Sequence, residues 1–343
     1  MHLYNNIPEG NVGSNMAYRV AWLDVARAIG IYAIYLGHFG EAAGPVYRFV
    51  FQFHVPLFFF LAGCTENYNQ EESLFRNIKR NIKTILLPAY FFAMISLMIY
   101  VINANADLTE ACTWGQLIIK GLVRNTYLAA SLWFLTCLFV VKTIFALLKK
   151  VKKWYWLVAA GIFMFLIAEY GMSPRPIDSP RYYYNLDSAC YYMHFHIIGF
   201  LAYPYLKEWL EKTGNIAKSI KTVIAVGLLV YAGLMYFQIN VLSYIPIHNM
   251  IADSGLRLVK TYLMIGAIIM LAYYLQGIEV LAKVGQDTLY LCGSEYMIKI
   301  VVPSIFGIVG LAINLDGPLY VCVYTMMLLW AGEKIFVPWE KKL

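Results

Sequence analysis

The chain has few charged residues for its length. Asp, Glu, Lys and Arg make up 14% of its 343 residues, against roughly 25% in soluble domains, while hydrophobic residues reach 61%, against roughly 45–50%. The mean hydropathy is +0.60. A folded soluble surface needs more charge than this. The composition therefore excludes a soluble globule, a disordered chain, a coiled coil and a nucleic-acid-binding surface, and it indicates that the solvent is lipid.

Several motifs of catalysis and metal binding are also missing. The six cysteines form no CxxC or CxxxC pair and lie mostly in apolar runs, which favours buried apolar residues over disulfides or zinc. Gly-Lys-Ser/Thr, GxGxxG and GxSxG do not occur, so P-loop, dinucleotide and nucleophile-elbow chemistry have no support. His194 and His196 point about 200° apart on a helix and cannot share a metal ion. No metal site is predicted.

Long apolar runs are what the sequence has in abundance. A membrane span needs about 20 helical residues, and ten candidate runs lie between charged, Pro, Asn or Gly breaks. They cover residues 20–40, 46–63, 82–102, 126–148, 154–170, 186–206, 221–242, 257–276, 288–312 and 318–336. The predicted fold is all-α, a polytopic membrane protein of about ten transmembrane helices around a membrane-deep cavity.

Basic residues gather in alternate loops, which predicts the orientation. Most of the 27 Lys and Arg residues fall on one side of the predicted spans, and that side is cytoplasmic by the positive-inside rule. An even number of spans then puts both termini in the cytoplasm. The expected organisation is an N-terminal tail at 1–19, a transmembrane domain at 20–336 and a C-terminal tail at 337–343. Because no Asn-x-Ser/Thr sequon occurs, we expect a bacterial plasma membrane.

Ionisable residues inside spans are costly in lipid and therefore indicate function. The first span contains Asp24, Arg27 and His38, with Glu41 at its outer end. At about 100° per residue, these four residues share one stripe about 100° wide, and Arg27 and His38 are roughly 16 Å apart along the axis. The stripe predicts an Arg near the cytoplasmic end and a His near the outer end of one cavity. A simple Asp24–Arg27 pair is the alternative, but it does not account for His38.

The second span carries a histidine beside a proline. Pro56 removes a helical hydrogen bond and is expected to free the carbonyl of Gln52. His54 lies next to this expected kink and could reach the stripe of the first span, or it could simply bond to a neighbouring helix. Glu169, Asp187 and Glu295 are further acids in or near spans, and Arg257 and Lys260 could neutralise some of them.

Five segments of the chain together form a recognisable pattern. Residues 23–38 (LDVARAIGIYAIYLGH), with ten residues between Arg27 and His38, and residues 53–63 (FHVPLFFFLAG) are similar to the first and second helices of the acyltransferase 3 family of integral-membrane O-acyltransferases. The basic run before 86–90 (LLPAY), then 132–135 (LWFL) and 285–290 (GQDTLY), are similar to later motifs. The order and spacing agree over almost the whole chain. Ala62 and Glu295 depart from the pattern, since relatives often carry Ser and His there.

The resemblance implies the reaction and its substrates. Family members take an acyl group, usually acetyl from cytoplasmic acetyl-CoA, and place it on a hydroxyl at or beyond the outer face. The acceptor is commonly a sugar of a surface glycan, so polysaccharide modification is expected. Acetyl-CoA would be a co-substrate, no metal is implied, and the partners would be the sugar acceptor and the lipid bilayer, not nucleic acid. The resemblance makes His38 the catalytic histidine.

The residues suggest how such a transfer would work. A neutral His38 could remove the proton of the attacking hydroxyl, a contribution of about 10²–10⁴-fold in rate, while Asp24, Glu41 or His54 set its tautomer. Trp133 or a freed backbone N–H could stabilise the oxyanion. Direct transfer and an acetyl-histidine intermediate both stay open. Glu295, which stands where relatives often carry His, concerns the type of acceptor more than the type of donor.

Other candidate residues concern binding of the donor. Arg27 lies too far from His38 to touch the reacting carbonyl and suits a polar group of the CoA arm. A cytoplasmic cluster could hold the CoA phosphates or could serve topology alone: Arg76, Lys79, Arg80 and Lys83. Two other classes compete with an enzyme. A transporter also places charges on broken helices, whereas a non-catalytic interaction subunit would not need the Arg27–His38 stripe.

Overall fold

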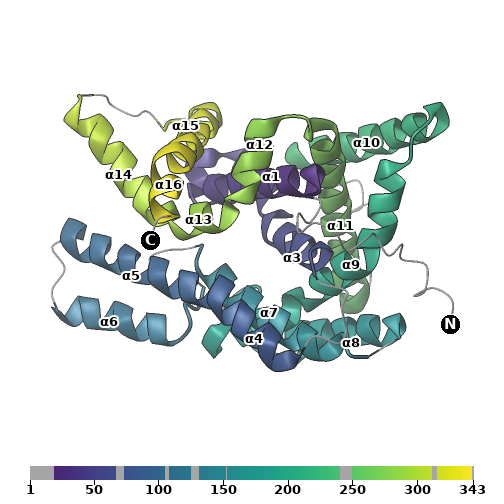
Figure 1. The fold of residues 1–343 in the computed structure, drawn as a ribbon, viewed down its shortest axis with the longest axis horizontal. Helices are drawn as coiled ribbons and strands as arrows, with labels where there is room; N and C mark the ends of the chain where they lie inside the picture. Colours follow the sequence, from purple (N-terminus) through teal and green to yellow (C-terminus); the bar gives the residue numbers. More distant parts are fainter. Residues whose placement is uncertain are drawn as a thin grey trace, which may run out of the picture.

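The regular elements of the described residues are all helices (Figure 1). The structure is a computed structural model that describes residues 19–66, 73–104, 108–124, 131–151, 153–239, 249–310 and 315–341. The helices of the first part are α1 (Ala21–Gly37), the 3₁₀ turn η1 (Gly40–Ala43), α2 (Pro45–Val50), α3 (His54–Cys64), α4 (Leu74–Asn81), the π-helical turn η2 (Ile82–Leu86), α5 (Leu87–Ala104), α6 (Leu108–Ile119) and α7 (Trp133–Leu148).

The second part of the chain continues the helical pattern. Its elements are α8 (Trp154–Leu166), the π turn η3 (Ile167–Gly171), the 3₁₀ turn η4 (Tyr183–Asn185), α9 (Leu186–Glu211), α10 (Asn215–Tyr236), α11 (Met250–Leu275), α12 (Glu279–Gln286), α13 (Thr288–Gly293), α14 (Glu295–Ile308), α15 (Pro318–Ala331), the π turn η6 (Gly332–Phe336) and α16 (Val337–Glu340). The predicted all-α class is confirmed.

Six helical stretches in the described residues, several of which join consecutive elements, are long and apolar enough to cross a membrane. They are Pro45–Cys64, Leu74–Ile102, Trp154–Gly171, Asn215–Tyr236, Met250–Leu275 and Pro318–Phe336. α1 and α9 are not among them. With 17 residues, α1 is shorter than any of the six, and most of its residues are buried. In α9 fewer than half of the 26 residues are buried. The six helices establish the multi-pass character, while the ten-span count and the cytoplasmic position of the termini stay predictions.

The second predicted span is divided, which changes the role of its proline. α2 ends at Val50 and α3 begins at His54, with a turn between them. Pro56 therefore lies in the first turn of α3, where a backbone N–H has no intrahelical acceptor to lose. The expected kink in one continuous helix was wrong, because the chain already breaks ahead of Pro56.

The ninth predicted span, 288–312, is also divided. α13 ends at Gly293, and α14 begins at Glu295, with Ser294 between them. The break leaves Glu295 in the first turn of a new helix, where a carboxylate is favoured by the partial positive charge of the exposed N–H groups. The interruption therefore positions an acid that a continuous helix would have placed mid-span.

α1 lies among several partners near the middle of the molecule (Figure 1). It packs against α3, α11, α12 and α15. The α12 contact is so close that a Cβ added to Gly285 would lie 1.7 Å from the Asp24 carbonyl oxygen. The glycine of the late sequence motif thus permits the backbones of α1 and α12 to touch.

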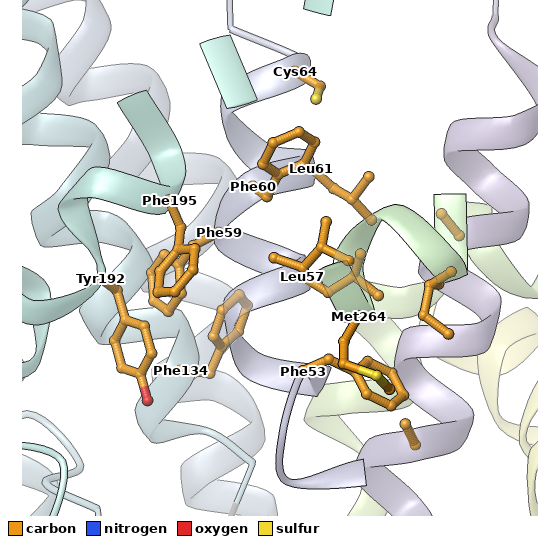
Figure 2. Packing of buried hydrophobic residues seen from close by; sticks show 14 of the residues in the cluster. Phe53, Leu57, Phe59, Phe60, Leu61, Cys64, Phe134, Tyr192, Phe195 and Met264 are labelled. Atoms are coloured by element: carbon orange, nitrogen blue, oxygen red, sulfur yellow. The ribbon is translucent and has the colours of Figure 1, made fainter. Parts of the chain in front are cut away.

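A second close crossing joins α3 to α9. An added Cβ would lie 2.0 Å from the His196 carbonyl oxygen at Gly63, and 2.0 Å from the Phe60 carbonyl oxygen at Gly199. Beside this crossing the Phe59 ring stacks on Tyr192 with 4.6 Å between centroids, in the aromatic core that Figure 2 shows. Two helices far apart in sequence are thereby held in a fixed register beside α1.

Candidate active site

His38 lies at the C-terminal end of α1, where its backbone N–H still bonds to the Ile34 carbonyl at 3.1 Å. Its side chain reaches α14. The ring Nδ1 lies 2.7 Å from Oε1 and 2.8 Å from Oε2 of Glu295, a residue only 3% exposed. Two segments 257 residues apart are therefore joined at the residue that the first-helix motif singles out.

Glu295 has a second basic partner one turn further along α14. Lys299 Nζ lies 2.8 Å from Glu295 Oε1 and donates to the Tyr35 carbonyl oxygen at 3.3 Å. Its ammonium also lies 4.4 Å from the centre of the Phe39 ring. The sequence analysis did not single out Lys299, although the i,i+4 spacing of Glu and Lys in an apolar run was a usable signal.

The contact decides which nitrogen of His38 is available. A carboxylate accepts only, so Nδ1 must carry the proton that it donates to Glu295. In the neutral ring, Nε2 then carries the lone pair and can accept a proton. The carboxylate also stabilises the imidazolium that forms when Nε2 takes a proton. Held in this way, the His38 ring has the geometry that a general base requires.

His38 lines a cavity of about 760 Å³, which we call the His38 cavity. Trp133, at the start of α7, and His54, at the start of α3, line it as well. His54 donates from Nδ1 to the Val50 carbonyl at 2.7 Å and packs edge-on against Phe51. Both candidate residues share the cavity with His38, and no contact between His54 and the His38 ring occurs among the described interactions.

Asp24 and Arg27 form a separate polar group near the other end of α1. The Asp24 carboxylate accepts from Arg27 Nη1 at 2.8 Å and from Arg19 Nε at 2.9 Å. Arg27 lines a second cavity of about 450 Å³, which we call the Arg27 cavity. Asp24 is thus engaged with arginines and does not contact His38.

The two cavities lie along the same face of α1. Ile34 of α1 and Phe134 of α7 line both of them, so the cavities adjoin at these two side chains. The Phe58 ring packs against Phe134 with 5.6 Å between centroids and adds to the partition from α3. Of the four residues of the predicted stripe, Arg27 and His38 line two adjoining cavities and not the single cavity that was expected. Asp24 lines neither cavity, and Glu41 lies in η1 beyond α1.

The four residues of the predicted basic cluster do not all lie at a cavity. Arg76, Lys79, Arg80 and Lys83 are all exposed on α4 and η2, but only Arg80 lines the Arg27 cavity. Its guanidinium donates to Asn77 at 2.9 Å. Lys142 of α7 lines the same cavity, as does Ala62, one of the two departures from the family pattern.

Glu66 stabilises the surroundings of the Arg27 cavity. Its carboxylate pairs with Lys142 and lies 3.5 Å from His196 Nε2 of α9. Burial disfavours the ionised carboxylate, but the nearby His196 and Lys142 outweigh it and lower the pKa of Glu66 to about 2. The end of α3 is thereby tied to α7 and α9.

Glu41 lies apart from the candidate base. It is in η1, just beyond α1, with an exposed side chain, and it makes no contact with His38 in the described structure. The part of the chain that the structure describes also contains no group of three or more His, Cys, Asp or Glu that could hold a metal ion.

One of the comparisons with known proteins identifies a family. The family model described as an acyltransferase domain, that of the acyltransferase 3 family, matches residues 20–332. No curated protein and no solved structure matches the chain. Because the matched segment is nearly the whole chain and includes both α1 and α14, the chain belongs to the acyltransferase 3 family.

Proposed function

We propose that this membrane acyltransferase moves an acetyl group from cytoplasmic acetyl-CoA to a hydroxyl of a sugar or surface glycan at the outer face. The observation that carries the proposal is the His38–Glu295 contact at 2.7 Å beside a cavity. Family membership supports acyl transfer in general, and the oriented imidazole supports a hydroxyl acceptor that must be deprotonated.

The chemical step uses few groups. As the acceptor oxygen attacks the thioester carbonyl, a C–O bond forms and His38 Nε2 takes the hydroxyl proton. The C–S bond then breaks, and the proton passes from His38 to the CoA sulfur, so that atoms and charges balance. Trp133, which lines the same cavity, is our candidate donor to the tetrahedral oxyanion. An acetyl-histidine intermediate would use the same Nε2.

The Arg27 cavity suits the acyl donor, acetyl-CoA. Arg27, Arg80 and Lys142 line it, and cationic side chains suit the anionic CoA arm. The exposed cluster of Arg76, Lys79 and Lys83 beside it would attract the phosphates at longer range. Its position on α4 also agrees with a cytoplasmic face by the positive-inside rule. The acetyl group would then pass Ile34 and Phe134 to reach His38.

The proposal is tested with His38→Asn in purified protein. We expect transfer of labelled acetyl from acetyl-CoA to fall by about 10²-fold or more, because the general base is lost, while acetyl-CoA binding is unchanged. The matched control is His194→Asn, since His194 is a buried histidine hydrogen-bonded to Tyr262 at 2.9 Å that does not line the cavity.

Near-normal transfer by folded His38→Asn protein would end the general-base assignment. Absence of acetyl-CoA binding to wild-type protein would favour a transporter.

A further inference from the structure

The His38 cavity has a lining of one charge sign. Its charged side chains are Arg124, Arg257 and Lys260, and no Asp or Glu is among the described residues that line it. Cavities with one sign of charge concentrate ligands of the opposite sign. The proposed reaction does not use these three residues.

Arg124 is held in place by backbone carbonyls and an aromatic ring, and its Nε–H has no hydrogen-bond partner among the described residues. Its Nη2 donates to the carbonyls of Pro176 and Ile177, at 2.6 Å each, and its guanidinium lies 5.1 Å from the centre of the Trp133 ring. Its backbone N–H bonds to the side chain of fully buried Asn185 at 3.2 Å. Arg124 Nε is buried with no hydrogen-bond partner, and the described part of the chain offers this arginine no paired carboxylate.

The other two cations lie one turn apart on α11. Arg257 is already paired with Glu169 and Asp253. Lys260 has no ion pair with any acid of the described residues, although it is only partly exposed. Within the cavity, the charges of Arg124 and Lys260 are therefore uncompensated, which is costly in a membrane protein unless a ligand supplies the counter-charge.

The remaining lining suits a ring-shaped ligand. Tyr47, Phe51, Trp133, Tyr191 and Tyr192 line the same cavity. Their flat faces provide apolar contact for the C–H face of a sugar, and their polar edges can meet its hydroxyls. The cavity thus combines an aromatic surface, the His38 imidazole, and two cations that have no paired carboxylate among the described residues.

We infer that the acyl acceptor is an acidic sugar, whose carboxylate or phosphate is bound by Arg124 and Lys260 while its hydroxyl faces His38. This inference rests on the proposed function and deepens it. The two sources of the negative charge, a uronic acid or a sugar phosphate, share the same recognition by cations. A neutral sugar would leave both cations unpaired.

The test measures binding to purified protein, so that it does not depend on turnover. The probes are glucose, galactose and mannose, each as the neutral methyl glycoside, the uronic acid and the 1-phosphate. We expect at least one acidic form to bind about tenfold more tightly than its neutral form, because hydrogen bonds to charged groups carry this much affinity. Comparing uronic acid with phosphate identifies the source of the charge.

Variants connect that preference to the two residues. In Lys260→Gln and in Arg124→Gln, the advantage of the acidic form should fall below about threefold, and it should persist in Arg48→Gln. Arg48 is an exposed arginine on α2 that does not line the cavity. Size-exclusion chromatography checks that each variant is folded.

Three results would overturn the inference: neutral sugars that bind as tightly as acidic ones, no binding of any acidic sugar, or an acidic preference that both variants keep. Tight binding of 3′-phospho-ADP that Lys260→Gln weakens would assign the cavity to the donor instead. A failure of the proposed function is distinguishable, since it would appear as missing acetyl transfer whatever the sugar affinities.

Discussion

At the scale of single residues, the site is defined by a partly buried contact between side chains that are remote in the sequence. His38 needs a carboxylate that holds its Nδ1 proton, and the structure supplies Glu295 at 2.7 and 2.8 Å. Lys299 in turn balances the charge of Glu295 at 2.8 Å. Glu295, which departs from the family pattern, therefore contacts the candidate base directly.

Glu295→Gln tests the contribution of this charge. The amide keeps a similar shape but cannot stabilise the imidazolium, so we expect acetyl transfer to fall by about 10²-fold with acetyl-CoA binding unchanged. Glu333→Gln is the matched control, because Glu333 is also buried and paired with a lysine, Lys283, at 3.1 Å. Activity of Glu295→Gln above half that of wild type would remove Glu295 from the mechanism.

At the scale of helices, the motif glycines explain how the polar residues are brought together. Gly285 brings α12 against the backbone at Asp24, and Gly63 brings α3 against α9. Neither glycine lines the His38 cavity or the Arg27 cavity. Their role in the sequence pattern is close helix packing, which keeps α1 in register with its partners.

Gly285→Ala tests this packing. The new Cβ would lie 1.7 Å from the Asp24 carbonyl oxygen, so the backbones must separate, and we expect a loss of about 1–3 kcal/mol in the free energy of unfolding. Gly255→Ala on α11 is the control, since its Cβ meets nothing within 4 Å. Thermal unfolding in detergent measures both, and equal midpoints for the two variants would contradict the packing role.

The contacts of Glu66, which connect the end of α3 to α7 and α9, predict that the stability of the protein depends on pH. The pKa of Glu66 is lowered to about 2, below its ordinary value, so its stabilising contribution is present above about pH 4.5 and is lost as the pH falls toward 2. Glu66→Gln removes it at all pH values, with a cost of about 3–5 kcal/mol because Lys142 is left unpaired.

Unfolding midpoints between pH 7 and pH 3 check the Glu66 prediction. Wild-type protein should lose stability toward pH 3 more steeply than Glu66→Gln. Glu211→Gln is the control, since Glu211 pairs with Lys207 at the surface at 3.9 Å and such pairs contribute little. Parallel pH curves for wild type and Glu66→Gln would refute the assigned pKa shift.

At the scale of the whole molecule, two cavities adjoin along α1. The Arg27 cavity and the His38 cavity share only Ile34 and Phe134 among their described lining residues. A donor from one side and an acceptor from the other would therefore meet at this apolar partition. Its size would limit the acyl group that can reach His38.

Ile34→Ala tests the partition. Removing three carbons should let a larger acyl group pass, so the rate with butyryl-CoA relative to acetyl-CoA should rise by about tenfold. Ile31→Ala is the matched control, because Ile31 is equally an α1 isoleucine that lines the Arg27 cavity alone. An unchanged butyryl-to-acetyl ratio in Ile34→Ala would show that the acyl group does not cross here.

Part of the site follows from local periodicity and part does not. The common face of Arg27 and His38 is predictable because both belong to one helix with a repeat of 3.6 residues. The expected role of Asp24 in setting the tautomer of His38 has no contact to support it, since Asp24 lies near the far end of α1 and pairs with Arg19 and Arg27. Glu295 as the partner is not predictable in this way, since 257 residues separate it from His38 and only the packing of α14 beside α1 brings them together.

The sequence by itself determined the class of the molecule: its scarcity of charge requires lipid around apolar helices, and its helical repeat requires the polar residues of α1 to share a face. Only the tertiary structure decided which carboxylate meets His38, which of the four basic residues of α4 and η2 lines a cavity, and that Arg124 and Lys260 line the same cavity as His38. The physical reason is that composition and periodicity act within a segment, whereas a site is made where distant segments pack.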